Sequence, residues 1–139
     1  MAENINLEIV TPEKIVVSED VQIVSAPGSL GEFGVLVGHT PFMTTLKTGT
    51  VRYVDSDGAE RYLFISGGFA EALPRKVTIL AESAERRRDI DFERAMAALE
   101  RAQKRMAEDR KRDDVDFTRA RAALERALQR VRLAESRKR

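Results

Sequence analysis

An eighteen-residue segment of this chain occurs twice. Residues 89–106 read DIDFERAMAALERAQKRM, residues 114–131 read DVDFTRARAALERALQRV, and 12 of the 18 positions are identical at an offset of 25. Because this offset accommodates one helix and one turn, the repeat predicts two similar helices that fold back on each other. An antiparallel hairpin of this kind needs the apolar residues of the repeat. It does not need the regular arginines, which require a separate explanation.

The apolar residues of both copies follow the seven-residue period of a coiled-coil seam. The large residues are Phe92, Leu99 and Met106 in the first copy and Phe117, Leu124 and Val131 in the second, with Ala95, Ala102, Ala120 and Ala127 between them. A turn near Arg112 brings Phe92 level with Val131 and Leu99 level with Leu124. Large residues then meet large residues, and alanines meet alanines.

The same register brings arginines together where the first helix begins. Arg94 lies level with Arg130, and Arg126 shares the face of Arg130 one turn away. Like charges do not cluster for stability, whereas forked guanidinium donors suit phosphate oxygens. The alternative is a solvated surface on which the arginines pair with glutamates. Those glutamates are Glu93, Glu100 and Glu125.

Aspartates occupy the positions where the two helices are expected to begin. Asp89 or Asp91 precedes the first helix, and Asp114 or Asp116 precedes the second. A carboxylate at an N-cap accepts hydrogen bonds from the free amides of the first turn. We therefore expect at least one aspartate of each pair to cap its helix.

The composition divides the chain into two domains. All 8 glycines and all 4 prolines lie before residue 75, and residues 1–85 carry a net charge of −6 while residues 86–139 carry +7. The sequence therefore predicts one domain over residues 1–85 and a second over residues 86–139. The basic second half suggests an anionic partner, although a solvated arginine-rich helix is the simpler interpretation.

Short apolar runs separated by turn residues fill the first domain. They are Ile5–Val10, Lys14–Ser18, Val21–Ser25, Gly34–Val37, Val51–Asp55, Arg61–Ser66 and Lys76–Leu80. Their alternation of polar and apolar residues is typical of half-buried strands, and Asp55–Gly58 reads as a hairpin turn. The predicted fold is α+β with segregated parts: an N-terminal antiparallel β-sandwich, or a barrel, followed by an antiparallel two-helix hairpin.

No constellation of residues indicates an enzyme. The glycines of the segment Gly28–Pro41 lack the Lys-Ser/Thr and the helix of a phosphate loop, so they indicate turns and close sheet contacts. His39 is the only histidine and the chain has no cysteine, so neither a metal site nor a catalytic base is supported. The N-terminal residues do not read as a signal peptide, and no apolar run approaches a membrane span of about 20 residues. We expect a soluble, cytoplasmic, non-catalytic protein.

Three motifs, in this order and ahead of the hairpin, resemble subunit epsilon of the F-type ATP synthase over essentially the whole chain. They are Gly31–Pro41, Ser66–Glu71 and Val77–Ala81, with Val37 where many members have proline. The resemblance implies a sandwich docked on subunit gamma and the membrane c-ring, with Glu32 and His39 near that contact. It also implies a mobile hairpin that inhibits ATP hydrolysis when it extends into the catalytic alpha/beta head. The complex places such a subunit on the cytoplasmic side of the inner membrane, where it meets the membrane only through its partners.

The resemblance also implies ATP as a regulatory ligand, with no metal required. Some bacterial members bind ATP on the folded hairpin through Ile/Leu-Asp-x-x-Arg-Ala, which Ile90, Asp91, Arg94 and Ala95 match. The arginines that such members carry on the second helix match Arg126 and Arg130, with Arg119 as a weaker candidate. Arg86–Arg88 are more basic than is usual in this family, at the expected entrance to the site.

A different interpretation is a basic hairpin that acts as a nucleic-acid-binding or adaptor protein. The second domain has only two aromatic residues, Phe92 and Phe117, and both fall on the predicted seam. No platform for base stacking then remains, so the sequence favours a rotor subunit without a nucleic-acid partner.

Overall fold

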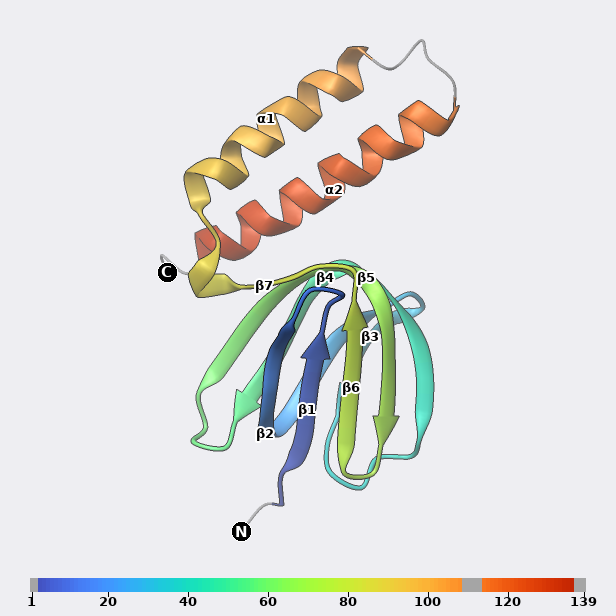
Figure 1. Ribbon diagram of the computed structural model, residues 1–139, viewed down its shortest axis with the longest axis vertical. Coiled ribbons are helices and arrows are strands. Elements are labelled where there is room, and N and C mark those ends of the chain that lie inside the picture. The colour runs from blue at the N-terminus through green and yellow to red at the C-terminus, as the bar shows by residue number, and fades with distance from the viewer. Residues whose placement is uncertain (1–2, 109–113, 137–139) are drawn as a thin grey trace. The chain divides into compact units, whose positions relative to one another are not determined.

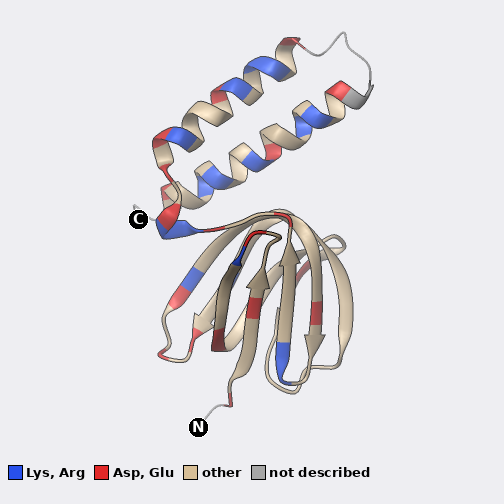
Figure 2. Cartoon of the chain, viewed as in Figure 1, with Lys and Arg blue, Asp and Glu red and all other residues tan. Residues whose placement is uncertain are grey.

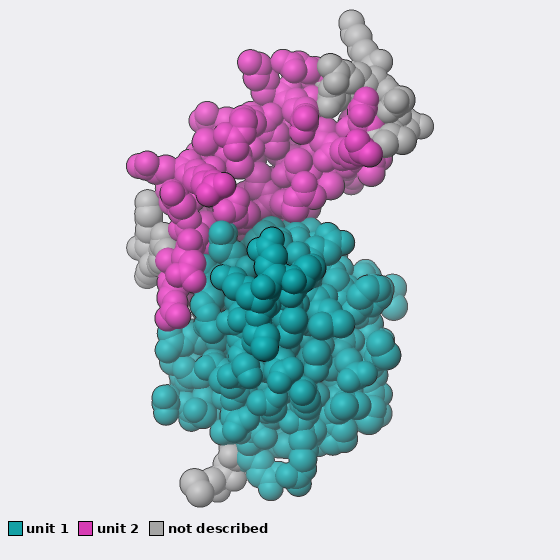
Figure 3. Space-filling model, viewed as in Figure 1, with its two compact units in different colours: residues 1–86 teal, residues 87–139 magenta. Residues whose placement is uncertain are grey.

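The computed structural model describes residues 3–108 and 114–136, apart from the side chains of residues 114 and 115. The chain forms two compact units, Met1–Arg86 and Arg87–Arg139 (Figure 3). The sequence analysis placed this division after residue 85. Among the described residues, no helix is both long and apolar enough to cross a membrane.

Among the described residues, the regular elements of the first unit are strands and those of the second are helices. The strands are β1 (Ile5–Val10), β2 (Ile15–Gly28), β3 (Gly31–Val35), β4 (Phe42–Asp55), β5 (Glu60–Leu73), β6 (Lys76–Ala81) and β7 (Ala84–Arg86). The helical elements are η1 (Arg87–Asp89), α1 (Phe92–Glu108) and α2 (Asp114–Ser136). The predicted fold class, a β-sandwich followed by a helical hairpin, is confirmed (Figure 1).

The strands of the first unit pair in the order β1-β6-β5-β4-β2-β3, β1 also pairs with β2, and β7 pairs with β5. Strands β1, β6, β5, β4 and β2 thus form a closed ring of five. A ring with an odd number of strands cannot be antiparallel throughout. The parallel pair is β1 with β6, and the other pairs are antiparallel. The sequence analysis did not anticipate this one parallel pair within the predicted antiparallel sandwich.

Three of the strands are much longer than the sequence predicted. Strands β2, β4 and β5 each span 14 residues, and β2 joins two runs that the sequence analysis kept apart. The missed halves of β4 and β5 pair with each other from Phe42↔Ala72 to Leu46↔Gly68. Glycine, threonine and alanine interrupt the apolar alternation in these halves. Pairing between distant segments, not local pattern, makes them strands.

The core of the first unit is aliphatic, with one tyrosine. Its fully buried side chains lie on the inward positions of the alternating strands, for example Ile5, Leu7 and Ile9 of β1. Asp55 closes the predicted β4–β5 turn by accepting hydrogen bonds from the amides of Asp57 (3.0 Å) and Ala59 (2.9 Å) and from Arg61 Nε (3.2 Å). These bonds, that of Ala59 first, lower the pKa of the Asp55 carboxyl. Gly58 has a φ of 87°, as the turn requires.

The second unit is an antiparallel hairpin in which α1 and α2 lie side by side (Figure 1). The two copies of the repeat bury equivalent positions. Ala95 and Ala120 are fully buried, and Ala102 and Ala127 are nearly so. Their large neighbours are less covered, and Phe117 is 37% exposed although the seam prediction placed it inside. The predicted turn near Arg112 lies outside the described residues.

Candidate ligand-binding face of the helical hairpin

The residues that precede and open α1 have distinct structural roles. Asp91 is the N-cap: its Oδ1 accepts a hydrogen bond from the amide of Arg94 (3.1 Å), and its carbonyl accepts one from the amide of Ala95 (2.9 Å). Ile90 is 2% exposed, and Ala95 is fully buried. Packing and capping thus account for three of the four motif positions. They leave the exposed side chain of Arg94 free to act on a ligand.

Arginines recur on one side of each helix. Arg94, Arg101 and Arg105 are spaced by seven and four residues along α1, and Arg119, Arg126 and Arg130 repeat this spacing along α2. These spacings bring side chains to within about 40° of one another around a helix. The two-fold rotation that exchanges two antiparallel helices has its axis perpendicular to the plane of the hairpin, so it leaves each face of the hairpin on its own side. The two copies are also equivalent in sequence. Both rows therefore lie on one face, called here the arginine face.

Two exposed arginines of this face, Arg94 and Arg126, form no ion pair with another described residue. Ion pairs form between Arg52 and Glu60, Arg61 and Asp55, Lys76 and Glu8, and Arg88 and Asp89, and none of these involves Arg94 or Arg126. Glu93, Glu100 and Glu125 each directly precede an arginine of this face. Adjacent residues on a helix point about 100° apart, so these glutamates do not face the arginines beside them. The alternative interpretation, in which glutamates neutralise the arginines, therefore finds no support at Arg94 and Arg126 among the described residues.

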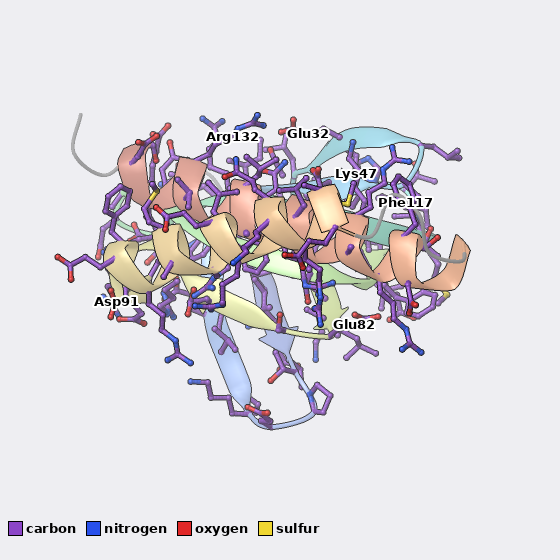
Figure 4. All side chains as sticks on the ribbon, turned by 90° about the horizontal axis from the view of Figure 1, so that it is seen from above. Glu32, Lys47, Glu82, Asp91, Phe117 and Arg132 are labelled. Carbon is purple, nitrogen blue, oxygen red and sulfur yellow. The ribbon has the colours of Figure 1, made fainter. Side chains whose placement is uncertain are left out.

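The antiparallel arrangement brings the predicted site residues to one end of the hairpin. Arg94 lies in the first turn of α1, and Arg126 and Arg130 lie in the second half of α2. The start of α1 and the end of α2 are adjacent (Figure 1), and Arg87 Nη1 donates a hydrogen bond to Ser136 Oγ (3.3 Å) across that end. Arg94 and Arg126 are exposed, and Arg130 is half-buried. Asp91 marks this end in Figure 4, and Figure 2 shows the basic residues along both helices.

Arg119, the weaker candidate, does not join this group. It lies near the start of α2, about ten residues from Arg130 and thus at the other end of the hairpin. Its neighbours across the hairpin are in the last turns of α1, where Arg105 lies. The arginine face therefore contains two clusters: Arg94 with Arg126 and Arg130, and Arg119 with Arg101 and Arg105.

The two candidate rotor-contact residues belong to the first unit. Glu32 is exposed on β3 opposite Pro27 of β2, and it is labelled in Figure 4. His39 lies in the turn after β3, where its Nδ1 is 2.8 Å from the carbonyl oxygen of Thr40 and its ring contacts Phe42 edge-on. Glu32 is therefore open to a partner, whereas His39 also holds its own turn together.

The basic run Arg86–Arg88 is not one surface. Arg86 ends the first unit, where its Nη1 donates to the hydroxyl of buried Tyr53 (3.1 Å) and its Nη2 to the carbonyl oxygen of Val16 (3.1 Å). Burial raises the pKa of Tyr53, as does its hydrogen bond with Glu19. The sequence analysis missed this network and assigned Arg86 to the hairpin. Its partners are 33 and 70 residues away, and no local pattern connects them.

Comparison with known proteins identifies the class of molecule. The family model "ATP synthase, Delta/Epsilon chain, beta-sandwich domain" matches residues 4–87, and "ATP synthase, Delta/Epsilon chain, long alpha-helix domain" matches residues 88–135. The chain belongs to the ATP synthase delta/epsilon chain family. Members are non-catalytic stalk subunits of that complex, which confirms the expectation that the chain is not an enzyme.

Individual relatives narrow the class to bacterial epsilon chains. The chain is 70% identical over 106 residues to the ATP synthase epsilon chain of Desulfatibacillum aliphaticivorans, with 76% of this chain and 75% of the relative covered. It is 66% identical over 108 residues to the epsilon chain of Desulforapulum autotrophicum, and the match covers 78% of this chain and 80% of the relative. The predicted resemblance to the epsilon subunit is confirmed.

Solved structures agree with this assignment. A chain of the Euglena gracilis mitochondrial ATP synthase, in a structure of its OSCP, F1 and c-ring, superposes with a TM-score of 0.80 at 26% identity. The match covers 100% of this chain and 84% of that one. A chain from a structure of the central stalk and c-ring of the Tetrahymena thermophila mitochondrial ATP synthase shares the fold, with a TM-score of 0.57 and 12% identity. The match covers 99% of this chain and 98% of that one.

Proposed function

We propose that this chain is a central-stalk subunit of an F-type ATP synthase that links subunit gamma to the c-ring and regulates ATP hydrolysis. Its likeness to chains in assemblies with the c-ring and F1 supports the docking role. In this proposal the first unit docks on the rotor, with Glu32 and His39 at the contact. The subunit then lies on the cytoplasmic side of the membrane and reaches it only through the complex.

The second unit is the regulatory arm. It has its own seam and is joined to the first unit through η1, so it can change position without unfolding. Extension of the arm toward the catalytic alpha/beta head inhibits hydrolysis. Removal of residues 88–139 from the assembled complex should leave ATP synthesis largely intact and raise ATP hydrolysis. Unchanged hydrolysis after this deletion would exclude an inhibitory arm.

ATP is the ligand of the arm in this proposal. The observation that carries it is the cluster of Arg94, Arg126 and Arg130 at one end of the hairpin, in which Arg94 and Arg126 are exposed and neither forms an ion pair with another described residue. These arginines bind the phosphates, and the Ile90–Ala95 segment lies near the base. A ligand that binds the folded hairpin more tightly than the extended one shifts the arm toward the folded state. ATP thus relieves inhibition when it is abundant.

Calorimetric titration of the whole chain with ATP tests the site. A charge-assisted hydrogen bond is worth about 1.5–3 kcal/mol, so Arg126→Ala and Arg130→Ala should each weaken binding by about ten-fold or more. Arg132→Ala is the matched control, because Arg132 is an exposed arginine of α2 outside the arginine face. Equal affinities of all three variants, or no binding to the unmodified chain at millimolar ATP, would remove ATP from the proposal.

A further inference from the structure

The second cluster of the arginine face is an image of the first. Each arginine of one cluster has an equivalent 25 residues away in the other. Arg94 corresponds to Arg119, Arg126 to Arg101, and Arg130 to Arg105. The two helices bury equivalent alanines, so the equivalence holds in the folded hairpin as well as in the sequence. The rotation that exchanges α1 with α2 therefore carries one cluster onto the other. The helix positions of the three arginines at one end are therefore equivalent to those at the other, with Arg130 half-buried and its equivalent Arg105 exposed.

Within the repeat, the positions beside the second cluster carry more positive charge than those beside the first. Two of the differences between the copies lie directly before an arginine of these clusters. Thr118 stands before Arg119 where Glu93 stands before Arg94, and Lys104 stands before Arg105 where Gln129 stands before Arg130. Both positions lie about 100° around the helix from the adjacent arginine of the face, so beside the second cluster one carboxylate is absent and one ammonium group is added. Arg101, Lys104, Arg105 and Arg119 are all exposed, and none forms an ion pair with another described residue. Three guanidinium groups and one ammonium group are left there without a described counterion.

We propose that Arg101, Arg105 and Arg119, flanked by Lys104, form a second anion-binding site, for a polyphosphate group. Forked guanidinium donors match phosphate oxygens in pairs, and repulsion among the cations is relieved when a polyanion binds. This site does not depend on ATP binding at the first. Only the comparison between the two sites rests on the proposed function.

The two ends differ in what they offer to a nucleobase. At the first end Asp91 is the N-cap, and Ile90 precedes the helix. At the second end α2 begins at Asp114, so the equivalent residues, 115 and 116, are already helical. No equivalent of the non-helical segment beside Arg94 is present there. The second site therefore binds the phosphate chain without selecting the base, and inorganic triphosphate should bind it about as well as ATP does.

The test is a titration of the whole chain with inorganic triphosphate, followed by calorimetry and by backbone amide shifts. The double variant Arg101→Gln/Arg105→Gln should weaken triphosphate binding at this end by at least ten-fold. The control Arg121→Gln/Arg132→Gln removes the same charge from exposed positions of α2 outside the arginine face and should change affinity by less than about two-fold, because the lost charges lie away from the contacts. All four arginines are outside the seam, so circular dichroism should show intact helices in both variants.

The outcomes separate this site from the first. Retention of triphosphate binding at the α2 start in Arg94→Gln/Arg126→Gln, and its loss in Arg101→Gln/Arg105→Gln, supports two sites. Equal losses in the Arg101/Arg105 and Arg121/Arg132 variants would show diffuse attraction and overturn the second site. Amide shifts confined to the Ile90 end would also overturn it, while leaving the ATP proposal intact. If the Ile90 end instead shows no response to ATP, the proposed function loses its ligand and the second site stands.

Discussion

Gly68 offers the sharpest test of how the first unit is packed. A methyl group at this position would overlap the carbonyl oxygen of Leu80 and lie 2.9 Å from the Cα of Ala81. Carbon atoms in favourable contact are about 3.5–4.0 Å apart, so β5 and β6 would have to separate by roughly 0.6 Å or more. Gly68 also has a backbone φ of 135°, a conformation that residues other than glycine rarely adopt. Gly68→Ala therefore combines backbone strain with a steric clash.

Gly31 is the matched control that separates these two effects. Its φ is 139°, but a methyl group there would meet no atom within 4 Å. Gly31→Ala should thus cost only the conformational strain, about 1–3 kcal/mol. Gly68→Ala should add the cost of overpacking, roughly 1–3 kcal/mol more. For a unit of this size each kcal/mol lowers the melting temperature by about 4–8 °C.

Thermal unfolding followed by near-ultraviolet circular dichroism measures the difference. The chain has no tryptophan, and both of its tyrosines, Tyr53 and Tyr62, lie in the first unit, so the tyrosine band of this spectrum reports the sandwich. We expect a clearly lower melting temperature for Gly68→Ala than for Gly31→Ala. Equal melting temperatures would show that the close approach of β5 and β6 is not a constraint. The glycines of the Ser66–Glu71 motif would then need another explanation.

Three further predictions concern single polar groups. Arg86→Ala should destabilise the sandwich by about 1.5–3 kcal/mol, because it leaves the Tyr53 hydroxyl and the Val16 carbonyl without their charged donor. The control Arg88→Ala should cost less than about 0.5 kcal/mol. Equal melting temperatures of the two variants would contradict the anchoring role of Arg86. The folded pKa of Asp55 is lowered, so its stabilisation is present above its ordinary pKa of 3.8 and is lost as pH falls through the folded value. Acid titration of stability should therefore show Asp55→Asn converging on the unmodified chain, and a constant gap would refute this. Asp91→Ala removes the N-cap of α1 and should cost the hairpin about 0.5–2 kcal/mol, measured as lost helical circular dichroism on heating, and no change would show that the cap is dispensable.

Local features of the sequence were sufficient to predict the helical hairpin. Apolar residues that recur every seven positions fix which face of each helix is buried, because a helix presents its residues with a constant period. The cap at Asp91 and the turn at Asp55–Gly58 also depend on neighbours a few residues away. The repeat likewise placed Arg94, Arg126 and Arg130 at one end, since two equal helices in a hairpin have few ways to align.

Only the tertiary structure decided how the strands join and which polar groups meet across them. The long strands β4 and β5 form because they pair with each other along most of their length. The parallel pair β1–β6 follows from the closure of a ring of five strands. Arg86 reaches Tyr53 and Val16 only because β7 pairs with β5. Sheet hydrogen bonds and cross-strand contacts join residues far apart in the chain, so no short window of sequence contains them. Helical periodicity is a local property, whereas sheet registry belongs to the whole fold.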